Sequence, residues 1–181
     1  MRCSQSRKSS SRCGPANGWE SEGLALVRDR DIVTLQIIYN MLEQDPGRSL
    51  IAAAEERGVG VLVRVPHSSG LLEGKYTAET TFPPNDHRSH RPREWLTDGL
   101  RKLEQLSFLT EGTGRTIGQA AIQFVLSSPA VASVLPNIYD AEQLDEFVGA
   151  AASTPLTADE LTGIANLYEA NFGLAPEPAR S

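Results

Sequence analysis

The stretch VLVRVPHSSGLLEGKY, residues 61–76, decides how this chain is read. An apolar run rich in β-branched residues predicts a buried strand. The run stops at Pro66, which cannot donate a hydrogen bond to a neighbouring strand. Two serines and a glycine follow at 68–70, and Lys75 comes soon after. Small polar residues after a strand can turn hydroxyl and backbone N–H groups toward an anion. The stretch therefore predicts a strand that opens into a loop suited to hold a phosphate.

The spacing in this loop excludes the nucleotide triphosphate loop. That motif has four residues between its glycines and a Ser or Thr after its lysine. Here three residues separate Gly70 from Gly74, and Tyr76 follows Lys75. On the residues alone, two interpretations stay open. The loop is either a phosphate site of another kind or an ordinary exit from a strand.

Charge is distributed unevenly along the 181 residues. The chain has a net charge of −6, yet residues 1–12 carry four basic side chains and no acidic one. The remainder is therefore more acidic than the whole, which argues against binding of nucleic acid. No apolar run approaches membrane-spanning length, and the start lacks the apolar core of a secretory signal. We expect a disordered basic tail over residues 1–12, no membrane partner and a cytoplasmic location.

Metal and disulfide chemistry are also not expected. The two cysteines, Cys3 and Cys13, form no paired motif. His87 and His90 are three residues apart, but their arginine-rich surroundings favour a solvated loop over a metal site. We therefore predict no metal.

Strands and helices alternate along the sequence. We expect strands at 31–39, 59–65 and 131–135, helices at 20–30, 48–57, 92–110, 116–127, 140–150 and 157–172, and irregular segments at 13–19 and 73–92. This alternation predicts a parallel sheet with right-handed crossovers. Three strands leave two open sheet edges, which suggests self-association.

Two further motifs give the first stretch a context. QIIYN, residues 36–40, ends the first expected strand, and SVLPNIYDAEQLDEF, residues 133–147, ends the third. In this order and spacing, the three motifs resemble the C-terminal half of an aldo-keto reductase. The resemblance implies an α/β fold, a partial (β/α)8 TIM barrel with roughly strands six to eight, spanning residues 13–174 before a tail at 175–181. It also implies binding of NADPH, with NADH possible, and a small carbonyl substrate in the whole enzyme.

The resemblance also implies a cofactor site. Gln36 is similar to the residue that holds the nicotinamide carboxamide, and Arg64 stands where an aromatic residue usually stacks on that ring. Asn137 stands for a glycine, which suggests a left-handed turn. Tyr139 lies where an Arg or Ser that binds the 2′-phosphate is common. The implied cofactor-binding residues are Gln36, Arg64, Val65, Pro66, His67, Ser68, Ser69, Gly70, Leu71, Lys75, Asn137, Gln143 and Glu146.

The family's catalytic Tyr, Lys, His and Asp have no counterparts here, so no catalytic residue is predicted. We expect an aldo-keto reductase-like, NAD(P)H-dependent oxidoreductase, represented by a cofactor-binding half with little activity alone. Two alternatives stay open. One is a non-catalytic half-barrel that self-associates or pairs with a missing half, and the other is a gene fragment without function.

Overall fold

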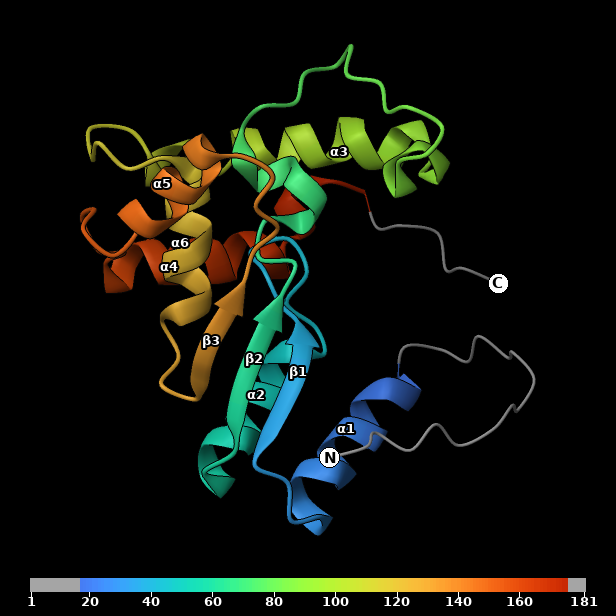
Figure 1. Ribbon diagram of the computed structural model, residues 1–181, viewed down its shortest axis with the longest axis vertical. Helices are drawn as coiled ribbons and strands as arrows, with labels where there is room; N and C mark the ends of the chain where they lie inside the picture. The colour runs from blue at the N-terminus through green and yellow to red at the C-terminus, as the bar shows by residue number, and fades with distance from the viewer. Residues whose placement is uncertain (1–16, 176–181) are drawn as a thin grey trace.

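The computed structural model describes residues 17–175 and shows a parallel three-stranded sheet with helices packed around it (Figure 1). The strand order is β1–β2–β3, formed by Thr34–Ile38, Gly60–Arg64 and Val131–Leu135. In register, Gln36 lies opposite Leu62, and Arg64 lies between Ile38 and Leu135. The predicted α/β class and parallel pairing are confirmed. The expected tail over residues 1–12 lies outside the described residues.

The helices follow the expected order with different ends. Six α-helices are present in the described part: α1 (Asn17–Asp29), α2 (Gly47–Arg57), α3 (Arg93–Glu104), α4 (Ile117–Leu126), α5 (Ala141–Gly149) and α6 (Ala158–Glu169). Short 3₁₀ turns are η1 (Ser68–Glu73), η2 (His87–His90), η3 (Ser107–Leu109) and η4 (Asn171–Gly173). The prediction of an irregular segment at 13–19 was wrong for residues 17–19, which are helical. The helix expected over 92–110 ends at Glu104.

Local hydrogen bonds explain where several helices begin and end. Gly58 adopts a left-handed conformation (φ 66°), and its N–H donates to the last turn of α2. Thr116 and Gln119 form the reciprocal capping pair that starts α4. Asp140 caps α5 by accepting from the N–H of Gln143. These polar residues fix the ends because each one bonds a backbone group that the helix itself leaves unpaired.

One face of the sheet is covered and the other is not. Val61 and Val63 are fully buried in the core shared with α2 and α4, and α2 lies behind the strands in Figure 1. The opposite face carries Gln36, Ile38 and Arg64, which are exposed. Among residues 17–175, no further strand pairs with the outer edge of β1 or β3.

A buried arginine holds the outer helices together. Arg115 is 3% exposed, and its guanidinium donates to the carbonyls of Leu109 and Thr154 and to the carboxylate of Glu160 at the start of α6. Burial acts to raise the pKa of Glu160, but hydrogen bonds from Thr157 and Arg115 outweigh it and lower that pKa.

No described helix is both long and apolar enough to cross a membrane.

Candidate functional site

The turn after β2, residues 65–75, lies at the end of the sheet to which the strand arrows point (Figure 1). Its backbone is unusual because three non-glycine residues have positive φ: Val65 (59°), Ser68 (47°) and Ser69 (58°). A β-branched residue in this region is a conformational outlier. Gly70 (φ 96°) has a further constraint, since a Cβ there would lie 2.1 Å from the hydroxyl of Tyr76. The 65–75 turn therefore has a tightly specified shape.

Two backbone amides of this turn are already occupied. The N–H of Ser68 donates to the carbonyl of Val65 (3.2 Å), and that of Gly70 donates to the carbonyl of His67 (3.0 Å). Both of these amides close the turn itself and are therefore not free to bind an anion. The hydroxyl of Ser69 instead accepts a hydrogen bond from Arg91 (3.4 Å), and Lys75 is exposed.

Asn40 joins this turn to the end of β1. Its side chain is fully buried, and its Oδ1 accepts from the N–H groups of Leu42 and Glu43. Its Nδ2 donates to the carbonyl of Val65 (3.0 Å) and to the carboxylate of Glu43 (2.8 Å). The same carboxylate accepts from the hydroxyl of Ser68 (3.3 Å). The side chain of Asn40 thus fixes the loop after β1 and the 65–75 turn relative to each other.

Gln143 joins the 65–75 turn to the start of α5. Its side chain is 5% exposed, its Nε2 donates to the carboxylate of Glu73 (2.9 Å), and its Oε1 accepts from the N–H of Tyr139 (2.8 Å). Burial raises the pKa of Glu73, while the hydrogen bond from Gln143 and the charge of Lys75 oppose that rise. Two segments seventy residues apart in the sequence therefore meet beyond the carboxyl ends of the strands.

Two implied site residues direct their side chains into packing. His67 is buried, its ring stacks on Phe147 at 4.2 Å, and its Nε2 donates to the carbonyl of Gly118 (3.1 Å). Burial lowers the pKa of His67. The carboxylate of Glu146 accepts from the hydroxyl of Thr116 (2.7 Å).

Asn137 is exposed and lacks the left-handed conformation expected of it. The chain enters α5 through an extended Asp140 (φ −149°, ψ 172°), and the N–H of Tyr139 bonds to Gln143. This extended entry explains why the segment needs no left-handed residue at 137.

Gln36, Ile38 and Arg64 of the uncovered face lie along an open groove of about 1520 Å³, whose other walls come mainly from α1, α2, α3 and α6. Gln36 and Arg64 lie in it together with Ser68, Leu71 and Arg91. The structure thus places the residues implied for the nicotinamide end on one groove. Lys75, Gln143 and Glu146 belong to the neighbouring region between the 65–75 turn and α5.

Comparison with known proteins identifies this arrangement. The sequence profile of the aldo/keto reductase family matches residues 22–169. The chain belongs to the aldo/keto reductase family. It is 33% identical over 145 residues to an aldo-keto reductase of Strobilurus tenacellus, covering 76% of this chain and 43% of the relative. It is 31% identical over 136 residues to L-glyceraldehyde 3-phosphate reductase of Escherichia coli O157:H7, covering 70% of this chain and 38% of the relative.

A solved structure confirms the predicted fold. The glycerol dehydrogenase of Gluconobacter oxydans matches with a TM-score of 0.68 at 23% identity, covering 82% of this chain and 46% of that one. The sheet and its helices therefore form part of an aldo/keto reductase barrel, as predicted. The chain spans less than half the length of these relatives.

The segment at 73–92, which we expected to be irregular, is held by arginine and aromatic side chains. Arg88 bonds the carboxylate of Asp86 and the hydroxyl of Tyr76, and its guanidinium lies 4.8 Å from the ring centre of Phe82. Arg91 lies 4.7 Å from the ring centre of Trp95. Within residues 17–175, no group of three His, Cys, Asp or Glu side chains is arranged to hold a metal.

The sequence patterns did not indicate Glu73 or the role of Asn40. Asn40 stands in the quoted QIIYN motif, so its position was visible although its hydrogen-bond partners were not. Glu73 stands inside the opening stretch. Its bond to Gln143 joins residues seventy positions apart, and no local pattern signals such a contact.

Proposed function

We propose that this chain is the part of an aldo/keto reductase that holds the nicotinamide dinucleotide. The observation that carries the proposal is the hydrogen bond from Gln143 to Glu73, because it joins the 65–75 turn to the start of α5. In a barrel of this type, phosphate sites form from the loops after the last two strands and an adjacent helix start. The bond joins the loop after β2 to the first turn of α5, the helix that follows β3.

The side chains near the carboxyl ends of the strands suit the binding of a dinucleotide. Gln36 offers an amide in the open groove to a carboxamide, and the planar guanidinium of Arg64 can stack on a ring. Ser69, Arg91 and Lys75 offer a hydroxyl and two positive charges to the diphosphate. Residues 137–146 would contact the adenosine. The remaining implied positions, among them Val65, Pro66 and His67, shape the turn that carries these groups.

The bound dinucleotide supplies the hydride for reduction of a small carbonyl compound. This chain's residues bind and orient it, but we assign none of them as the proton donor to the carbonyl oxygen. Such a donor contributes about 10²–10⁴-fold to a rate. We therefore expect little reductase activity from the chain by itself.

Titration of the 181-residue chain with reduced nicotinamide dinucleotide, followed by nucleotide fluorescence, tests the proposal. Replacement Lys75→Gln removes an exposed positive charge beside Glu73 and is expected to weaken binding about tenfold, because phosphate contacts are mainly electrostatic. Arg57→Gln is the matched control. It removes the same charge from the last turn of α2. That turn precedes β2 and therefore lies at the end of the sheet where the strands begin, away from the 65–75 turn. Equal weakening by both variants, or an unchanged affinity in Lys75→Gln, contradicts the proposed site.

The uncovered face favours a second candidate function, a half-barrel that associates with a second copy or with a complementary segment. Ile38 is 40% exposed and Leu135 43%, and they belong to the outer strands β1 and β3. Apolar side chains beside two open sheet edges are typical of an interface.

A further inference from the structure

The region between the 65–75 turn and α5 is rich in negative charge. Glu73 lies there, held by Gln143, and Glu146 is close enough to act on its charge. The first turn of α5 adds Glu142, and Asp140 stands just before it. If the proposed function is right, this region receives the adenosine ribose of the dinucleotide.

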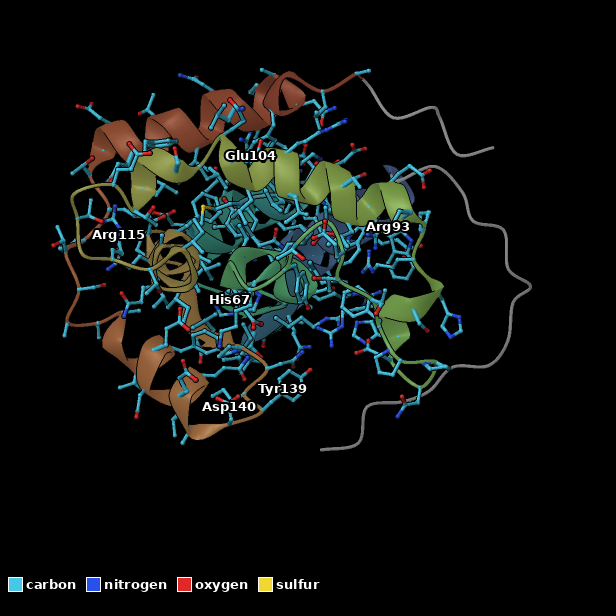
Figure 2. The ribbon with its side chains drawn as sticks, turned by 90° about the horizontal axis from the view of Figure 1, so that it is seen from above. His67, Arg93, Glu104, Arg115, Tyr139 and Asp140 are labelled. Carbon is cyan, nitrogen blue, oxygen red and sulfur yellow. The ribbon has the colours of Figure 1, made fainter. Side chains whose placement is uncertain are left out.

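The partial positive charge at the start of α5 already faces the carboxylate of Asp140. A helix start carries a partial positive charge that suits a phosphate. Here the carboxylate of Asp140 accepts from the N–H of Gln143 at 2.8 Å and takes up that charge. Figure 2 shows Asp140 and Tyr139 side by side at this end of the helix. A phosphate would have to approach a helix start that already holds an anionic side chain.

Positive charge nearby is largely paired. The guanidinium of Arg88 forms two hydrogen bonds to the carboxylate of Asp86. Lys75 is exposed and takes part in none of the ion pairs of the described residues, but Glu73 lies near enough for the two charges to interact. Tyr139, 68% exposed, carries no charge toward the region. Two cations of the described part therefore lie near Glu73, of which Arg88 is paired with Asp86 and Lys75 is in no ion pair.

We infer that the adenosine end of the site favours NADH over NADPH. The 2′-phosphate that distinguishes NADPH brings about two negative charges at neutral pH, and Glu73 and Asp140 would repel it. A ribose that keeps its 2′-hydroxyl can instead donate to a carboxylate, which is how acidic residues select NADH in other dinucleotide folds. The inference deepens the proposed function, since it names which dinucleotide the same site takes.

Parallel titrations of the 181-residue chain with NADH and NADPH test this selectivity. We expect NADH to bind about tenfold more tightly at low salt, with the ratio shrinking as salt screens the repulsion. Glu73→Gln keeps an oxygen acceptor for Gln143 while removing the charge, and should reduce the ratio by strengthening NADPH binding. Glu56→Gln, an exposed carboxylate at the far end of α2, is the matched control and should leave the ratio unchanged.

A second variant guards against a change in folding. Tyr139→Arg places a cation at an exposed position beside the start of α5 and should raise NADPH affinity severalfold with little effect on NADH. NADPH binding as tight as NADH in the unchanged chain overturns the inference and leaves the proposed function standing. Failure of both dinucleotides to bind overturns both.

Discussion

At the scale of single residues, His67 shows how a position of the binding turn also serves the core. Its ring stacks on Phe147, and its Nε2 bonds the carbonyl of Gly118. An apolar side chain of similar size, such as leucine, could pack against Phe147 in the same space. Unlike leucine, a buried imidazole couples folding to pH, since burial lowers its pKa.

This coupling gives a prediction with a definite sign. In the unfolded chain a histidine binds a proton below about pH 6.5. In the folded chain His67 binds a proton only at a lower pH, because burial lowers its pKa. The unfolded state then holds more protons, so the free energy of unfolding falls as the pH drops below about 6.5. The fall ends at the lowered pKa of the folded state and is at most about 1.4 kcal/mol per pH unit.

His67→Leu should remove this slope, because leucine retains contact with Phe147 and cannot bind a proton. Urea unfolding between pH 7.5 and 5.5 measures it. His90→Gln, at an exposed position of η2, is the control and should retain the slope. An undiminished slope in His67→Leu would show that another group is responsible.

At the scale of elements, the 65–75 turn depends on Gly70. We predict that Gly70→Ala destabilises the fold by about 2–3 kcal/mol, because alanine adds both a left-handed backbone cost and a clash with Tyr76. Urea unfolding gives the value. Gly58→Ala isolates the backbone cost, since Gly58 has a similar positive φ and a Cβ there meets nothing within 4 Å. Equal losses in the two variants would mean that Tyr76 moves aside freely.

Element boundaries could be predicted where neighbouring residues determine them. Thr116 with Gln119, Thr157 with Glu160, and Gly58 marked helix ends correctly because their bonds span three or four residues. At Asp140 only half of such a reciprocal pair is formed, since the side chain of Gln143 accepts from the N–H of Tyr139 and not from that of Asp140.

Prediction failed where distant contacts decide. Nothing local signals that Glu73 meets Gln143, or that buried Arg115 joins Glu160. The segment 73–92 read as irregular because its order comes from Arg88 and Arg91 lying over aromatic rings. The quoted motifs indicated that the loop after β2 and the start of α5 follow neighbouring strands, but not which of their hydrogen-bonding groups are already used.

At the scale of the whole molecule, the uncovered face predicts association. The chain should sediment as a larger species at higher concentration, because open edges and exposed apolar side chains are buried by pairing. Leu135→Lys places a charge on that face and should shift the equilibrium toward monomer in analytical ultracentrifugation. Val148→Lys, at a 66% exposed position on α5, is the control. A monomer at every concentration would remove the second candidate function.

The bond between Gln143 and Glu73 has a consequence for the energetics of recognition. The two segments that would flank the dinucleotide are tied by the protein's own side chains, so their relative placement is set before any nucleotide arrives. A preorganised site loses little ordering entropy on association. The contacts that the nucleotide makes with these two segments therefore contribute more of their free energy to the binding affinity.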